Sequence, residues 1–172
     1  MQSNPRGIDI LKKKPLISNS LIVGRSFEEN SLGKAYQEYM IKHGFNADER
    51  PQVRFQDDVD IAYVLVRYRQ VHDFWHVLCD LPPTEMGEIA LKWFEWGETG
   101  LPSCGLSAML GPLRLSAKEK RDLLTIYIPW ALRSTSNSVE LMSYSYEDNL
   151  NVDINIVRKQ LNIERAPKIM LP

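Results

Sequence analysis

The chain has 172 residues, of which 44% are hydrophobic and 25% are charged, and its formal net charge is −1. This composition is typical of a soluble globular protein with one core, and the lack of a basic excess argues against nucleic-acid binding. The two cysteines form no disulfide framework, so we expect buried free thiols in a reducing compartment. No segment approaches the ~18 uncharged apolar residues that a membrane-spanning helix needs.

The first 24 residues contain two prolines and two glycines. They predict an extended N-terminal arm with one helical turn, at about residues 8–13. Residues 25–172 predict a single helical domain.

Helical signals begin at Ser26, which has Glu29 three residues later, the spacing of a capping box. A helix is expected at about residues 31–42, and Gly44 would end it. Residues 46–58 lack periodicity and predict a loop.

The longest helical pattern covers residues 58–80, where apolar and aromatic residues recur at steps of three and four. Pro82 and Pro83 must end this helix, because proline has no N–H to donate and restricts the residue before it. Thr84 is expected to cap a second helix, which would run to about Gly97.

The remaining sequence predicts shorter helices. A weak helix is expected at residues 106–110, and the pair Ser116–Glu119 has capping-box spacing ahead of another helix that Pro129 should kink. Residues 138–161 have helical spacing with a break at 149–153. Strand signals are weak throughout, so the sequence predicts a mostly α fold, a single-domain irregular helical bundle.

Two of the three histidines, His72 and His76, stand four residues apart and therefore share one side of a helix. Two imidazoles at this spacing can bind a single cation, as in the HExxH helices of zinc enzymes. Asp73 lies on the flank of that face, where it could bind the cation, orient an imidazole or act as a base on bound water. If the chain folds back at the two prolines, Glu88 comes opposite His76.

The chemistry of these four residues leaves alternatives open. Burying ionisable groups without partners is costly, and a bound cation would remove that cost; a hydrogen-bonded network without metal would do so as well. Nitrogen and carboxylate ligands suit zinc, iron, manganese and cobalt alike. His43 together with the His72–Asp73 pair has the pattern of HD phosphohydrolases, and a zinc protease would need Asp73 in place of its usual glutamate base.

Neighbouring residues have simpler interpretations. Trp75 and the aromatic residues at positions 93–96 are expected to line the core, or a groove for a flat ring or an isoprenoid tail. Lys92 stands one turn after Glu88, the spacing of an ordinary ion pair. Glu95 is expected at the surface.

The pattern His-Asp-x-x-His, followed by eleven residues and Glu, resembles the signature of the ubiquinone (coenzyme Q) biosynthesis protein four family. The segments "GEIALKWFEWGETGLPSC", "YIPWAL", "YSYED" and "VRKQLNI" also resemble that family, so the likeness covers about residues 4–163. It implies a helical fold and a divalent metal bound by His72, Asp73, His76 and Glu88, which would also be the catalytic residues. Zinc is the metal it favours, with iron, cobalt and manganese as alternatives.

The same resemblance implies a function. The family is expected to act on polyprenylated aromatic precursors of ubiquinone by oxidative decarboxylation, in which a hydroxyl replaces the C1 carboxylate, and to organise the ubiquinone-synthesis complex. The alternative is a non-catalytic scaffold that binds prenyl lipid. The implied partners are the precursor, other ubiquinone-biosynthesis enzymes, a membrane surface bound peripherally and a second copy in a homodimer. The implied location is the matrix side of the mitochondrial inner membrane, or the cytoplasmic membrane surface in a bacterium.

Overall fold

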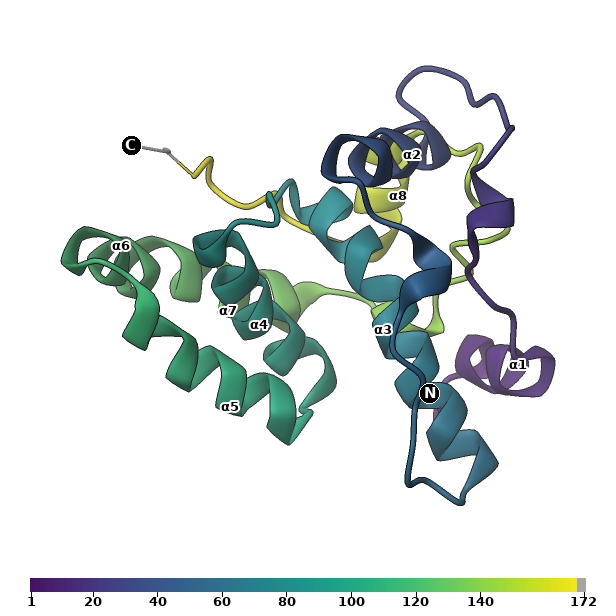
Figure 1. Ribbon diagram of the computed structural model, residues 1–172, viewed down its shortest axis with the longest axis horizontal. Helices are drawn as coiled ribbons and strands as arrows, with labels where there is room; N and C mark the ends of the chain where they lie inside the picture. The colour runs from purple at the N-terminus through teal and green to yellow at the C-terminus, as the bar shows by residue number, and fades with distance from the viewer. Residues whose placement is uncertain (170–172) are drawn as a thin grey trace. The chain divides into compact units, whose positions relative to one another are not determined.

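The computed structural model describes residues 1–169 and consists of helices joined by loops and turns (Figure 1). These residues form no strand, and an isolated antiparallel bridge joins Ser31 and Asp153. The mostly α fold is therefore confirmed. The chain forms two compact units, one of residues 1–77 and 140–157, the other of residues 78–139 and from 158 onward. A domain boundary between residues 24 and 25 stays a prediction.

The first unit contains the N-terminal helices and most of the longest one. Its elements are α1 (Pro5–Lys13), η1 (Asn19–Leu21), α2 (Leu32–His43), η2 (Ala47–Glu49), α3 (Val59–Cys79, except its last two residues), η5 (Leu141–Ser143) and the start of α8 (Ile154–Leu161).

The N-terminal arm is more helical than the sequence analysis predicted. The side chain of Asn4 accepts a hydrogen bond from the N–H of Arg6, and Pro5 occupies the first helical position, where its missing N–H costs nothing. The helix ends where Lys14 takes a left-handed conformation with φ 47°. These local signals give α1 nine residues instead of the single turn that we expected.

The helix α2 ends at Gly44 as predicted, but its cap is Ser31 and not Ser26. The Ser31 hydroxyl accepts the N–H of Lys34 at 3.1 Å. Next to this cap, the N–H of Leu32 donates to the carbonyl of Val152 at 2.8 Å. This pairing with a segment about 120 residues away in sequence places the start of α2, and Figure 1 shows the beginning of α8 beside it.

The core of the first unit forms around α3. Phe74 stacks on Tyr36 of α2, with ring centroids 3.9 Å apart and planes 10° apart. The indole N–H of Trp75 donates to the Tyr146 hydroxyl at 2.9 Å. These contacts fix the rotation of α3 about its axis, and with it the direction in which the histidines of α3 project.

The second unit consists of α4 (Glu85–Thr99), α5 (Pro102–Leu110), η3 (Gly111–Arg114), α6 (Ala117–Asp122), η4 (Leu123–Tyr127), α7 (Ile128–Asn137) and the end of α8. Both α5 and α7 pack against α4. The predicted helix at 106–110 begins earlier, at Pro102, while the capping box of Ser116 and Glu119 is confirmed. Of residues 138–161, only η5 and α8 are helical.

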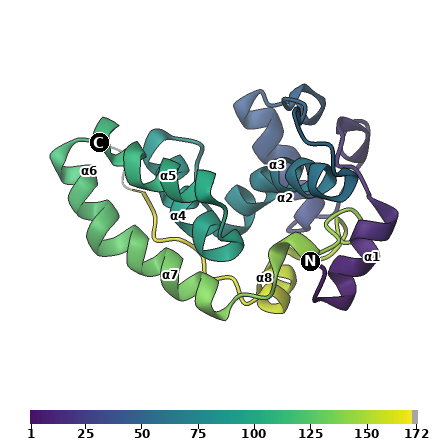
Figure 2. The ribbon, with the colours of Figure 1, turned by 90° about the horizontal axis from the view of Figure 1, so that it is seen from below.

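Pro129 is accommodated by a change of helix type. Figure 2 shows α6, η4 and α7 following one another along a single rod, and the middle element, η4, is a π-helical turn. Its last hydrogen bond runs from the N–H of Ile128 to the carbonyl of Leu123, five residues back. The wider π turn makes room for a proline that has no N–H and a bulky ring. The sequence analysis expected a kink at this residue, and the chain uses a π turn before it.

Glu95 is buried, which contradicts our expectation that it lies at the surface. Its Oε2 lies 2.6 Å from the Lys92 ammonium, and the Cys104 thiol donates to the same oxygen at 3.7 Å. The side chain of Glu95 is 0% exposed. Since α5 carries Cys104 and packs on α4, tertiary contacts bury this carboxylate, and the paired ammonium offsets part of its desolvation.

Gly87 should tolerate no side chain. A Cβ at this position would stand 2.0 Å from the carbonyl oxygen of Pro82. We therefore expect Gly87→Ala to lose roughly 1–3 kcal/mol of unfolding free energy in urea denaturation, because the first turn of α4 must move. Gly44→Ala is the control, since its Cβ would meet no described atom within 4 Å and only the φ of 66° opposes it. Equal losses in the two variants would contradict the clash.

Candidate metal centre

Three of the four predicted site residues lie on α3, which has 21 residues and ends at Cys79. Asp80 follows in a left-handed conformation with φ 60°, and the two prolines come directly after Leu81. Thr84 then begins α4 by accepting the N–H of Gly87 on its hydroxyl at 3.2 Å. Glu88 therefore lies near the N-terminus of α4, where the helix dipole favours the ionised carboxylate that a metal binds.

His72 and His76 face the same side of α3, as their spacing predicted. Their ring centroids are 4.8 Å apart and their planes are 87° apart. His76 is 1% exposed and His72 is half-buried. The ring of His76 stacks on Tyr39 of α2, with centroids 5.6 Å apart and planes 22° apart, so its orientation is fixed by packing.

His72, His76 and Glu88 form a group that could hold a metal ion. Each offers one ligand atom, and these atoms lie within 4.8 Å of one another. Two ligands that each stand ~2.1 Å from one ion are at most ~4.2 Å apart, which is close to the 4.8 Å within which these atoms lie. Two imidazoles and a carboxylate also suit the metals that the sequence suggested. The residues present thus fit a divalent metal.

Asp73 is held by an arginine. Its Oδ2 accepts a hydrogen bond from Nη2 of Arg50 at 2.7 Å, and the two side chains are 16% and 15% exposed. The same guanidinium donates to the Tyr36 hydroxyl at 2.9 Å and to the carbonyls of Ile17 and Ala47. Asp73 is not among the three residues of the metal-binding group within residues 1–169. Direct binding of a metal by Asp73 therefore stays a prediction, and the geometry favours a supporting role.

Burial and charge shift the pKa values of two groups around Asp73. Burial alone would lower the pKa of Arg50, but the charges and hydrogen bonds of Tyr36 and Asp73 raise it overall. Burial raises the pKa of Tyr36 to about 12, partly opposed by the charge of Arg50. Both shifts favour a charged guanidinium beside a neutral phenol, which is the arrangement that holds Asp73.

Above about pH 10, the unfolding free energy is expected to fall. Tyr36 keeps its proton to a higher pH in the folded than in the unfolded protein, so its contribution is complete below the unfolded pKa and is lost as the pH rises towards about 12. Tyr36→Phe should make the fall of the unfolding free energy with pH less steep by up to about 1.4 kcal/mol per pH unit. A shallower fall should remain in this variant, because the pKa values of Tyr63 and Tyr144 are also raised to about 12. Urea denaturation at several alkaline pH values measures both slopes, and an equal slope in Tyr36→Phe and in the unchanged protein would contradict the prediction.

His43 lies in a row of aromatic rings. Its ring centroid is 4.9 Å from that of Tyr39, which in turn stacks on His76. Among the residues that the structure describes, the metal-binding group does not include His43. The HD phosphohydrolase pattern would need this third imidazole as a ligand.

Sequence reasoning missed Tyr36, Tyr39 and Arg50. The two tyrosines stand three residues apart on α2, so their common face could have been read from the helical spacing. Nothing in the sequence indicated that this face packs on α3. Arg50 follows η2 in a loop without periodicity, and no local signal pairs it with Asp73.

The comparison with known families gives one match over nearly the whole chain. The family model described as "Coenzyme Q (ubiquinone) biosynthesis protein Coq4" matches residues 1–167. It covers the histidine pair, Asp73 and Glu88.

Similar proteins come from eukaryotes and from a cyanobacterium. "Ubiquinone biosynthesis protein coq4, mitochondrial" from Schizosaccharomyces pombe is 41% identical over 95% of this chain, which spans 61% of that protein. The Nematostella vectensis protein "Ubiquinone biosynthesis protein COQ4 homolog, mitochondrial" is 38% identical over 98% of this chain and 84% of its own length. A crystal structure of a putative ubiquinone biosynthesis protein from Nostoc punctiforme PCC 73102 has a TM-score of 0.74 at 20% identity, covering 93% of this chain and 76% of that one. The last likeness shows the fold alone.

Proposed function

Because this chain belongs to the Coq4 family of coenzyme Q (ubiquinone) biosynthesis proteins, we propose that it is a metal-dependent enzyme that decarboxylates a polyprenylated aromatic precursor oxidatively. In this reaction the bond between ring carbon C1 and its carboxylate breaks, carbon dioxide leaves, and a hydroxyl is placed on C1. The change is a two-electron oxidation, for which dioxygen is the proposed oxidant: water supplies the hydroxyl, dioxygen takes up the two electrons and two protons, and hydrogen peroxide leaves with the carbon dioxide. The observation that supports it is the group formed by His72, His76 and Glu88.

The three side chains have complementary tasks in this proposal. The imidazoles and the Glu88 carboxylate would hold the cation. A divalent metal bound there supplies positive charge for the carboxylate or phenolic oxygen of the ring. Zinc has no redox chemistry of its own, so an oxidation at this site favours iron, cobalt or manganese.

Residues around the group keep it in place. Tyr39 covers one face of the buried His76 ring, which limits its rotation. The ion pair of Arg50 and Asp73 fixes a negative charge one residue after His72, on the flank of the same helix. We assign Asp73 the role of supporting the site electrostatically and, through Arg50, of fixing α3 to the loop after α2.

The rival function is a scaffold that binds the prenyl precursor without converting it. Purified protein, loaded separately with zinc, iron, cobalt or manganese and given a C1-carboxylated prenylphenol in air, distinguishes the two. Turnover with at least one metal, lost in Glu88→Gln and kept in Glu85→Gln, supports the enzyme. Glu85 is the matched control, because it is an exposed glutamate on the same turn of α4. Binding of the precursor without turnover under every metal would establish the scaffold.

A polyprenylated substrate lies in lipid, so the protein must contact a lipid surface to reach it. Among residues 1–169, no helix is long and apolar enough to cross a bilayer. The segment 106–113 of α5 and η3 exposes four apolar side chains by 54–76%, namely Leu106, Met109, Leu110 and Leu113. The exposed basic residues Arg114 and Lys118 follow it. An apolar patch bordered by positive charge suits an anionic membrane surface, and we propose peripheral binding through it.

The double variant Leu110→Glu/Leu113→Glu is expected to weaken binding to anionic phospholipid vesicles by about tenfold or more, because it removes apolar contact and adds repulsion. Vesicle co-sedimentation measures the partitioning. Ile41→Glu is the control, since Ile41 is an apolar residue on α2 that is 74% exposed and does not belong to segment 106–113. Equal partitioning of the double variant and the unchanged protein would contradict the proposed contact.

The proposal extends to location and partners. Since the relatives are named as mitochondrial proteins, the proposal places this chain in the mitochondrion. The matrix side of the inner membrane is the finer part of the proposal, and it comes from the family resemblance. The proposal also includes a homodimer and an organising role among other ubiquinone-biosynthesis enzymes. These parts rest on membership of the family.

A further inference from the structure

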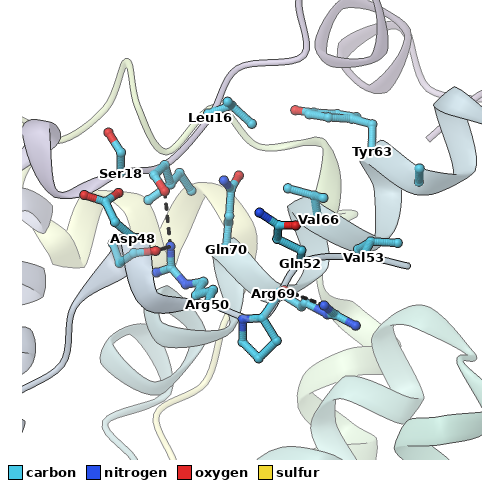
Figure 3. Close-up of a pocket in the computed structure, with 14 residues that line it drawn as sticks. Leu16, Ser18, Asp48, Arg50, Gln52, Val53, Tyr63, Val66, Arg69 and Gln70 are labelled. Atoms are coloured by element: carbon cyan, nitrogen blue, oxygen red, sulfur yellow. Dashed lines mark hydrogen bonds between the residues drawn. The ribbon is translucent and has the colours of Figure 1, made fainter. Parts of the chain in front are cut away.

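A pocket of about 510 Å³ lies in the first unit, beside the N-terminal half of α3 (Figure 3). This volume is in the range of small-molecule sites. Its lining comes from residues 16–18, from η2 and the loop that follows it to residue 53, and from α3 residues between 62 and 70. None of the four predicted metal-site residues lines it.

The pocket has a polar and an apolar end. Figure 3 shows Ser18, Asp48 and Arg50 at one end, and Tyr63, Val66 and Val53 at the other. The Tyr63 hydroxyl donates to the carbonyl of Pro15 at 3.0 Å, so that end contributes a fixed aromatic ring and two aliphatic side chains. Such a lining suits a ligand with an apolar body and one polar group.

Gln70 supplies a buried polar group between these two ends (Figure 3). The residue is 8% exposed, and its Oε1 has no hydrogen-bond partner among residues 1–169. A buried amide oxygen without a partner is unfavourable, and most such groups in folded proteins are satisfied. A ligand that donates a hydrogen bond to this oxygen would satisfy it.

The charges of the pocket disfavour an anionic ligand. Arg50 is neutralised by Asp73, and both its Nη atoms already donate to protein acceptors. Arg69 donates to the carbonyl oxygen of Pro51 at 2.5 Å and keeps its positive charge, which the negative charge of Asp48 balances in the lining. Asp48 contributes a negative charge at the polar end. A neutral donor therefore fits better than a carboxylate or phosphate.

We propose that this pocket binds a small neutral amphiphile with one hydroxyl, an alcohol or a phenol, which donates its O–H to Oε1 of Gln70. The apolar body lies along Val53, Val66 and the ring of Tyr63. Binding needs no metal, so the site is independent of the proposed decarboxylation.

Calorimetric titration of metal-free protein in the presence of a chelator tests this proposal with three probes: octanol, para-propylphenol and para-propylanisole, which is the methyl ether of the phenol. We expect at least one hydroxyl compound to bind, and the ether to bind about tenfold more weakly than the phenol if the phenol is the ligand. If only octanol binds, its methyl ether takes the place of the anisole. No binding of either hydroxyl compound, or equal binding of a hydroxyl compound and its ether, would overturn the proposal.

Two glutamines on the pocket provide a matched pair of variants. Gln70→Met keeps the length of the side chain and removes the amide, so it should bind the hydroxyl compound and its ether alike. Gln52→Met alters an exposed amide at the same pocket and should keep the preference. Val66→Phe fills the apolar end and should abolish binding. Circular dichroism checks that each variant folds, and if Gln70→Met does not, the unchanged protein's preference and Val66→Phe decide the outcome.

Discussion

Replacing His76 with alanine is expected to weaken metal binding by at least about 100-fold. His76 is one of three residues whose ligand atoms gather within 4.8 Å, and it is the most deeply buried of them. Its ring packs on that of Tyr39, with centroids 5.6 Å apart. Elemental analysis of the purified protein, followed by competition with a chromophoric chelator, measures the change.

The control for this variant is His43→Ala. His43 is the third histidine of the chain, and its ring centroid lies 4.9 Å from that of Tyr39, the residue on which His76 stacks. Its loss should leave metal affinity within about threefold, because the metal-binding group does not include it. Unchanged metal binding in His76→Ala, or a comparable loss in His43→Ala, would contradict the assignment of the ligands.

Arg67→Ala is expected to lose about 3–5 kcal/mol of unfolding free energy. Arg67 is 0% exposed, and its guanidinium binds the Glu147 carboxylate with both terminal nitrogens. It also donates to the carbonyl of Tyr144 at 2.6 Å. Alanine would leave Glu147, which is 11% exposed, without its cation and would open a cavity in the core of the first unit. Urea denaturation followed by near-ultraviolet circular dichroism measures the loss.

Two further variants separate charge from packing. Arg67→Met/Glu147→Gln should be more stable than Arg67→Met alone, because no unpaired charge remains buried. Lys34→Ala removes an ion pair with Glu38 at the surface, where the side chains are 29% and 63% exposed, and should cost less than about 1 kcal/mol. A loss in Arg67→Ala as small as that in Lys34→Ala would contradict the buried ion pair.

Local chemistry explains which parts of the fold could be predicted from the sequence. The end of α3 follows from two prolines and the start of α4 from a capping threonine, and these signals act within a few residues. The start of α2 near residue 31 is also predicted from the sequence, but the sequence assigns its cap to Ser26, because the pairing with Leu150 and Val152 that supports a cap at Ser31 lies far outside a helical window. The burial of Glu95 depends in the same way on packing between helices.

The candidate metal centre likewise depends partly on local spacing and partly on contacts between distant segments. The spacing of His72 and His76 fixes their geometry on one helix, and a tight turn limits where Glu88 can lie, so the sequence could name all three. The partners that orient them come from α2 and from a loop. Tyr39 and Arg50 carry no motif, and their roles are visible only in the folded chain.

Release of carbon dioxide from the C1 carboxylate of the precursor is the direct test of the proposed oxidative decarboxylation. Metal-loaded protein would be given a prenylphenol precursor in which the carboxylate carbon is isotopically labelled, and both labelled carbon dioxide and ring product would be measured. We expect labelled carbon dioxide in equal amount to a product hydroxylated at C1, and neither of them from His76→Ala. Precursor bound to metal-loaded protein, with no labelled carbon dioxide released under any of the four metals, would contradict it.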